Sequence, residues 1–334
     1  MAAKKTLARR ERSQRTPGHR PRRVGASRPE KAEAVESSEP VEPAEPKPED
    51  TPEVLAPAPG PFVVGIGASA GGLEALTAFF AATSADSGLA FVVVTHQQPQ
   101  TPSLLPELLA RHTRMPVAAA SDHVQLQADH VYVCPPGKDL ALLRGALQLM
   151  PSQTAPRTHL PIDYFFRSLA EDQKDRAICI VLSGTGTDGS LGLRAIKGHS
   201  GMAIVQDEAS AHYAGMPHSA AATLLADYVL EPAKMPAQLL KYTRAALGMG
   251  SAATSDSELR QALPKIFVLL RDHMGHDFSD YKPNTMERRI QRRLRVHGLT
   301  QPAAYVALLQ KQPQELELLF HELLINVTQF FRDP

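Results

Sequence analysis

Three residues in this sequence have the chemistry of a nucleophile, a general base and its carboxylate partner: Ser69, His96 and Asp188. A serine hydroxyl is a weak nucleophile until a neighbouring imidazole takes its proton, and that imidazole needs a carboxylate to fix its tautomer. The three residues are far apart along the chain. They can act together only if the fold brings them to one place.

Each of the three follows a short apolar run of the kind that forms a strand buried on both faces. These runs are 62–67, 89–94 and 177–182. Stretches with helical spacing of apolar residues separate them, which indicates a parallel sheet covered by helices. Ligands bind beyond the carboxyl ends of strands in such sheets, so we expect the hydroxyl, the imidazole and the carboxylate to meet at that edge.

The turn after the first strand strengthens this interpretation, because Gly67-Ala68-Ser69-Ala70-Gly71 matches the G-x-S-x-G nucleophile turn. Small neighbours let such a serine stand exposed between a strand and a helix. The helix that starts near Gly71 would direct free backbone N–H groups at a developing oxyanion. The chain order Ser, His, Asp differs from the Ser, Asp, His order of α/β-hydrolases, which disfavours that fold.

Each motif also has a simpler explanation. Small residues at a strand-to-helix turn permit close packing, a histidine can cap a strand, and an aspartate before glycine is routine at a helix start. Residues 65–70 also resemble a dinucleotide-binding turn, which needs an acidic residue at the end of the next strand. That strand ends Val94-Thr95-His96-Gln97 without one, so nucleotide binding ranks below catalysis.

The remaining pattern completes one α/β domain over about 61–247, with a doubly wound, mostly parallel sheet and helices on both faces. Further strands are predicted at 116–118, 130–134, 202–205 and 228–230, a hairpin at 140–143 and 146–150, and helices at 73–80, 102–111, 162–170 and 191–197. A linker follows at 248–258. From 259 to 334 the apolar residues recur at helical spacing, which predicts a small all-α domain.

Composition excludes several classes of protein. The net charge of +1 excludes a globally polybasic or polyacidic protein, and no apolar run approaches the roughly 18 residues that span a bilayer, so we expect no membrane insertion. A nucleic-acid partner is disfavoured, although the basic half of residues 1–60 has the composition to contact nucleic acid, acidic lipid or an acidic partner. Residues 1–60 join a basic segment to an acidic, proline-rich one and are predicted to be a disordered tail. Cys134 and Cys179 fit buried, reduced thiols in a cytoplasmic protein. The scattered histidines suggest no metal site, and nothing indicates a cofactor.

Five segments together resemble the catalytic domain of chemotaxis protein-glutamate methylesterases of the CheB type. They are residues 64–72, 95–96, 133–137, 161–168 and 182–189, with Gly215-Met216-Pro217 following in the same order. The resemblance covers about 62–245. It implies hydrolysis of γ-methyl glutamyl esters on chemoreceptor helices, with Ser69 as nucleophile, His96 as base and Asp188 as its partner. The implied oxyanion and pocket residues are Ala70, Gly71, Thr185, Gly186 and Met216.

The sequence departs from that family at two positions, where Ala70 replaces a frequent threonine and Thr185 a frequent methionine. The family's receiver domain has no counterpart in residues 1–60, so we expect different regulation or none. A catalytically quiet signalling scaffold, which binds receptor-like partners through both domains, is the alternative to an esterase.

Residues 259–334 resemble the N-terminal helical domain of receptor methyltransferases of the CheR type. The resemblance rests on Phe278, Tyr281-Lys282, the basic run 288–293 and the segment 323–333. It implies that a basic helix carrying Arg288, Arg289, Arg292 and Arg293 faces the acidic receptor helix, although such a run can also be a solvated face. The S-adenosylmethionine-binding domain would begin after residue 333, and we expect this chain to lack it. We therefore expect a truncated hybrid without methyltransferase activity.

Overall fold

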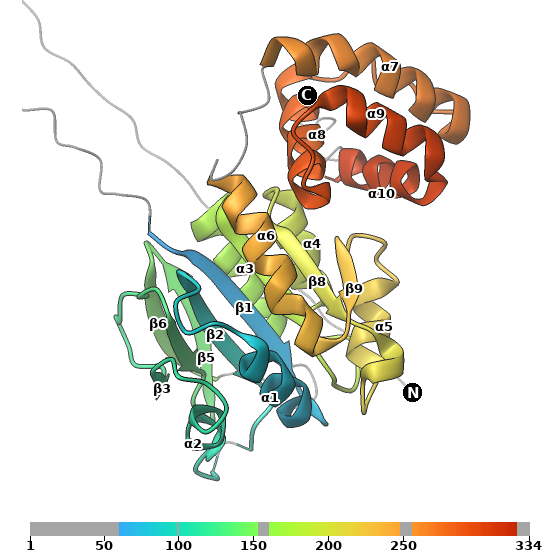
Figure 1. Ribbon diagram of the computed structural model, residues 1–334. Helices are drawn as coiled ribbons and strands as arrows, with labels where there is room; N and C mark the ends of the chain where they lie inside the picture. Colours follow the sequence, from blue (N-terminus) through green and yellow to red (C-terminus); the bar gives the residue numbers. More distant parts are fainter. Residues whose placement is uncertain (1–59, 99, 153–159, 248–255, 326–334) are drawn as a thin grey trace, which may run out of the picture. The chain divides into compact units, whose positions relative to one another are not determined.

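The computed structural model of the chain describes residues 60–98, 100–152, 160–247 and 256–325 (Figure 1). All of them belong to one compact unit, Pro57–Pro334. The predicted disordered tail and most of the predicted linker lie outside the described residues. Within the described residues no helix is long and apolar enough to cross a membrane.

A seven-stranded sheet forms the centre of the first domain, and every pair of neighbouring strands in it is parallel. Its order is β3-β4-β2-β1-β7-β8-β9. The strands are β1 (Phe62–Ala68), β2 (Leu89–Thr95), β3 (Val117–Ala119), β4 (His130–Val133), β7 (Ala177–Val181), β8 (Met202–Gln206) and β9 (Tyr228–Leu230). The predicted doubly wound α/β domain is therefore confirmed.

Both faces of the sheet are covered, which is why its central strands carry no polar side chain except Thr95 at the end of β2. One face packs against α3 (Pro161–Gln173), α4 (Ser190–Gly198), α5 (Gly215–Ala221) and the hairpin of β5 (Lys138–Leu143) and β6 (Ala146–Pro151). The other face packs against α1 (Gly72–Ala82), α2 (Leu105–Ala110) and α6 (Met235–Ala246) (Figure 1).

The sequence prediction differs from the structure at a few elements. Helix α2 is shorter than the predicted 102–111, and helices α5 and α6 were not predicted. Helix α5 has only seven residues, too few for a helical period to stand out. Helix α6 has Pro236 in its first turn and directly follows a short 3₁₀ segment (Pro232–Lys234); a proline at this position is common at helix starts, so the sequence did carry a signal for it.

Four helices follow the sheet and form the predicted all-α domain, called the helical module below. They are α7 (Asp256–Met274), α8 (Pro283–His297), α9 (Pro302–Lys311) and α10 (Pro313–Leu324). Helix α7 begins inside the segment 248–258 that composition indicates as a linker. Leucine, isoleucine and aromatic side chains from all four helices share a core of their own.

The strand order creates the position for a site. Strand β1 lies between β2 and β7, and the chain leaves β1 towards β2 but returns later to β7. The loops after β1 and β7 therefore diverge at the carboxyl edge of the sheet. This is the topological switch point at which open α/β sheets bind ligands.

Candidate active site

Ser69 lies in the tight turn between β1 and α1. Its backbone N–H donates to the carbonyl oxygen of Ser183 at 2.9 Å, which ties the ends of β1 and β7 together. Gly71 has a φ of 70° at the start of α1, in the left-handed region. A Cβ there would lie 2.8 Å from both the His212 Cβ and the Ser183 Oγ, so the turn requires glycine for conformation and for space.

The structure brings Ser69, His96 and Asp188 into hydrogen-bond range. His96 directly follows β2, and its Nδ1 lies 3.0 Å from the Ser69 Oγ. Its Nε2 lies 3.0 Å from the Asp188 Oδ2, and the imidazole is 33% exposed while the carboxylate is 2% exposed. With the ring proton on Nε2, the imidazole donates to Asp188 and Nδ1 accepts from the serine hydroxyl. This is the geometry of a nucleophile, a base and a base-orienting acid.

Besides His96, the groups that hold Asp188 in the described part of the chain are backbone N–H groups, with no lysine or arginine among them. The N–H of Ile162 donates to its Oδ2 at 3.1 Å, and those of Asp163 and Gly189 donate to its Oδ1 at 2.8 and 2.9 Å. Ile162 and Asp163 belong to the first turn of α3, where the helix dipole favours a negative charge. These three bonds fix the carboxylate on the side of His96.

Asp163 is a second buried carboxyl beside Asp188, and sequence reasoning did not single it out. Its Oδ1 accepts the N–H of Gly192 in the first turn of α4 at 2.6 Å. Its Oδ2 has no hydrogen-bond partner among the described residues. Burial, together with the charge of Asp188, raises the pKa of Asp163. Asp188 and Asp163 therefore cap the starts of α3 and α4 respectively, and the available signal was the position of Asp163 inside the segment 161–168.

Ser183 and Gly184 pack the nucleophile turn against the loop before α5. The Ser183 hydroxyl donates to the Ala70 carbonyl at 2.9 Å and accepts the Tyr213 N–H at 2.9 Å. A Cβ on Gly184 would lie 2.1 Å from the Met216 Sδ and 2.9 Å from the Ser69 Cβ. Close backbone approach at this point thus sets the position of Ser69.

The predicted oxyanion and pocket residues lie around this turn and differ in how exposed they are to solvent. Thr185 and Gly186 are exposed, and Met216 is fully buried. The N–H of Met216 donates to the Gly184 carbonyl at 2.9 Å, so the contribution of Met216 is its side chain. The N–H of Gly72, the first residue of α1, donates to the Ser69 carbonyl at 2.9 Å, and the N–H groups that follow it in the first turn need partners outside the helix.

The four predicted receptor-binding arginines do not form one exposed face. Arg288 is exposed, but Arg289, Arg292 and Arg293 are 4%, 1% and 2% exposed. Arg289 donates to the carbonyl oxygens of Glu322 and Ile325, while Arg292 and Arg293 bind buried carboxylates within the chain. The prediction that all four arginines face a receptor is therefore corrected, because three of the four guanidinium groups bind acceptors inside the protein.

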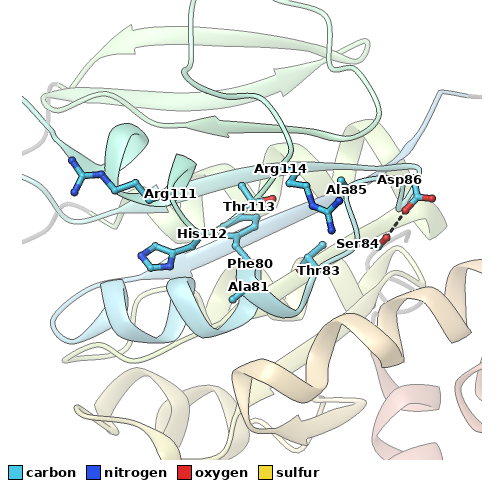
Figure 2. Close-up of a pocket in the computed structure, with 10 residues that line it drawn as sticks. All are labelled: Phe80, Ala81, Thr83, Ser84, Ala85, Asp86, Arg111, His112, Thr113 and Arg114. Atoms are coloured by element: carbon cyan, nitrogen blue, oxygen red, sulfur yellow. Dashed lines mark hydrogen bonds between the residues drawn. The ribbon is translucent and has the colours of Figure 1, made fainter.

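A separate pocket of about 650 Å³ lies beyond the ends of α1 and α2 (Figure 2). Its basic residues do not converge, since the guanidinium groups of Arg111 and Arg114 point to different ends in Figure 2. It contains none of the three triad residues. Among the residues that the structure describes, no group of histidine, cysteine, aspartate and glutamate side chains could hold a metal ion.

Relatives of the chain align with between about half and about two thirds of its length. An uncharacterised 104.1 kDa protein of Rhodobacter capsulatus is 38% identical over 250 residues, which are 68% of this chain and 26% of that protein. A protein-glutamate methylesterase/protein-glutamine glutaminase of Burkholderia lata is 36% identical over 189 residues, 54% of this chain and 53% of the relative. The chain thus spans about a quarter of the first relative and about half of the second.

A solved structure is also similar to this chain. The crystal structure of the Thermotoga maritima CheB methylesterase catalytic domain superposes with a TM-score of 0.51 at 27% identity, covering 54% of this chain and 98% of that domain. The family model of the CheR methyltransferase all-alpha domain matches residues 261–324. The family model of CheB methylesterase matches residues 64–239, which is more than half of the sequence. The matched range includes all three residues of the hydrogen-bonded triad, and the chain belongs to this family.

Proposed function

We propose that this chain is a protein-glutamate methylesterase that hydrolyses glutamyl methyl esters on chemoreceptors, with Ser69 as nucleophile, His96 as general base and Asp188 as the residue that orients it. The observation that carries the proposal is the unbroken chain of two 3.0 Å contacts from the Ser69 Oγ through the His96 ring to the Asp188 carboxylate. The names of the Burkholderia relatives support the substrate class.

The first half of the reaction forms an ester on Ser69. The His96 Nδ1 takes the hydroxyl proton while the Ser69 Oγ attacks the γ-carbonyl carbon of the methylated glutamate. The negative charge that develops on the carbonyl oxygen is stabilised by backbone N–H groups at the start of α1. Collapse of the tetrahedral intermediate breaks the bond to the methoxy oxygen, which takes the proton from His96 and leaves as methanol.

The second half regenerates the enzyme. Water takes the place of methanol, and His96 removes one of its protons as its oxygen attacks the acyl carbon. The second tetrahedral intermediate expels the Ser69 oxygen, which recovers its proton from His96, and the glutamic acid side chain that results releases its remaining proton to solvent and leaves as the carboxylate. Asp188 stays ionised throughout and stabilises the imidazolium that forms in each half.

The test measures methanol release from a methylated receptor, for wild type and for Ser69→Ala. Wild type is expected to release methanol and Ser69→Ala to release none above background. A fluorophosphonate, which labels an activated serine whatever the natural substrate, provides a second readout by intact mass. Receptor binding without methanol release and without labelling of Ser69 in the wild type would instead support a scaffold.

A further inference from the structure

The largest buried group of charges in the described residues lies between the esterase domain and the helical module, remote in sequence from Ser69. The esterase domain contributes Lys197, from the last turn of α4, and Asp227, just before β9. Their side chains are 1% and 0% exposed, and the Lys197 Nζ lies 2.8 Å from the Asp227 Oδ1. The Ala203 N–H in β8 donates to the other oxygen of Asp227 at 2.9 Å, which anchors this carboxylate to the sheet.

Helix α8 of the module places two arginines on that carboxylate. Arg292 forms an ion pair with the Asp227 Oδ2 through Nη2, and the Arg293 Nη1 lies 2.8 Å from Oδ1. The Arg292 Nε also donates to the Gly201 carbonyl at 2.9 Å, in the loop between α4 and β8. Asp227 therefore receives both guanidinium groups while the sheet holds it in place.

Helix α10 supplies the carboxylates that complete the network. The Glu322 oxygens lie 2.8 Å from the Arg292 Nη1 and 3.0 Å from the Lys197 Nζ, so this residue also connects the two domains. Glu315 accepts from the Arg293 Nε at 2.8 Å. The three cations are thus matched by three carboxylates, all nearly inaccessible to water.

Burying charges of this kind is costly unless each finds a partner, and removing one partner leaves an uncompensated charge. Burial alone would raise the pKa of Asp227, but the charges of Arg292, Lys197 and Arg293 outweigh it and hold that pKa below its usual value. Burial and the Arg292 charge lower the pKa of Lys197. Because Lys197 contacts two carboxylates, we assign it the charged form.

Apolar packing accompanies the charges at the same surface. Val296 of α8 is 1% exposed and belongs to the hydrophobic cluster on the face of the sheet that also contains Leu239 and Tyr242 of α6. The Tyr228 hydroxyl donates to the Val296 carbonyl oxygen. Helix α8 therefore packs on the esterase domain along its apolar side as well as through its arginines.

We propose that α8 is an interaction surface whose partner is the chain's own esterase domain, with Asp227 as the anion that its arginines recognise. The module is fixed to the esterase in cis, and the two domains behave as a single body. In that state Arg292 and Arg293 are not available to an acidic partner. Asp188 lies just before α4, and Lys197 lies in the last turn of this helix. The helix that follows the catalytic loop therefore also takes part in binding the module.

Cleavage of the full-length chain between the two domains tests this proposal without an activity assay. A protease site is placed within residues 248–255, the purified chain is cleaved there, and gel filtration at micromolar concentration shows whether the pieces stay together. Wild type is expected to elute as one complex. Arg292→Ala should weaken the association at least about a hundredfold, so that the pieces separate. Arg288→Ala, which removes an exposed arginine of the same helix, should leave the complex intact.

Two results would overturn the proposal: separation of the cleaved wild-type pieces, or co-elution of the Arg292→Ala pieces to the same extent as those of Arg288→Ala. Hydrogen exchange over 62–68 identifies a variant whose sheet has failed to fold. In that event Asp227→Asn, which keeps an acceptor for the Ala203 N–H, replaces Arg292→Ala. The cleaved wild type decides the question even if both variants misfold.

Discussion

The methyl group that Gly67→Ala adds should disable the triad although it lies in a strand and touches none of the three residues. A Cβ at position 67 would lie 2.3 Å from the Ile162 Cγ2, where ordinary contacts start at 3.4 Å. Ile162 is fully buried, and its N–H is one of the three that hold Asp188. The start of α3 must therefore retreat by about 1 Å, and the Asp188 carboxylate moves with it.

The expected losses follow from that displacement. Overpacking of this size costs about 1–3 kcal/mol of folding free energy. A shift of about 1 Å in a catalytic group costs about a hundredfold in rate, which corresponds to roughly 2.7 kcal/mol of barrier. We therefore expect Gly67→Ala to fold at 25 °C but to lose about a hundredfold in kcat for methanol release. Labelling of Ser69 by a fluorophosphonate should slow by a similar factor.

Gly65→Ala is the matched control, because its Cβ would meet Leu169 and Phe165 at 2.9 Å, further along α3 and away from Asp188. It should lose stability but keep most of its turnover. The double variant Gly67→Ala/Ile162→Ala removes the clashing side-chain atoms and should recover activity. Equal turnover in the two glycine variants, or a double variant as slow as Gly67→Ala, would refute the idea that the start of α3 positions Asp188.

Three further outcomes follow from the same contacts. Asp163→Asn keeps an acceptor for the Gly192 N–H and should retain kcat within a few-fold, whereas Asp163→Ala should lose tenfold or more; steady-state kinetics at pH 7.5 separates them. Gly184→Ala drives the Met216 side chain and Ser69 apart and should abolish fluorophosphonate labelling while circular dichroism stays native. Burial alone would raise the pKa of Glu315, but its partners His297 and Arg293 outweigh burial and lower that pKa to about 2, so Glu315 stabilises the fold above pH about 4.5. That contribution, about 3 kcal/mol, should disappear as urea titrations move from pH 5 towards pH 2.

The sequence predicts the location of the triad because the rule it uses is geometric. Buried parallel strands are recognisable as apolar runs, their carboxyl ends meet at one edge, and Ser69, His96 and Asp188 each follow such a run. The G-x-S-x-G turn adds local detail, since Gly71 must adopt a positive φ next to Ser183. Nothing in these patterns required knowledge of contacts between remote residues.

Asp163 and the arginines of α8 could not be predicted in the same way. Asp163 follows a proline at a helix start, where an acidic residue is ordinary, and only the approach of Gly192 from α4 shows what its carboxyl binds. The basic run 288–293 has the composition of a solvated face, because Asp227 and the glutamates that neutralise it lie elsewhere in the chain. A usable signal was present in α10, where Glu315 and Glu322 share a face with buried leucines.

The construction around Asp188 also distinguishes the two functions considered for this chain. A carboxylate buried beside a histidine, with no lysine or arginine of the described residues to neutralise it, costs free energy that the imidazole and three backbone N–H groups only partly offset. A domain that merely binds partners would not need an ionised group here, because an amide oxygen can also accept from the Asp163 and Gly189 N–H groups. Such a cost is typical of functional sites. We therefore expect Asp188→Asn to retain or raise the thermal midpoint of unfolding while it lowers methanol release by about four orders of magnitude, since the amide would hold His96 in the wrong tautomer. A variant that loses stability but keeps its turnover would refute the idea that the Asp188 carboxylate is there for catalysis.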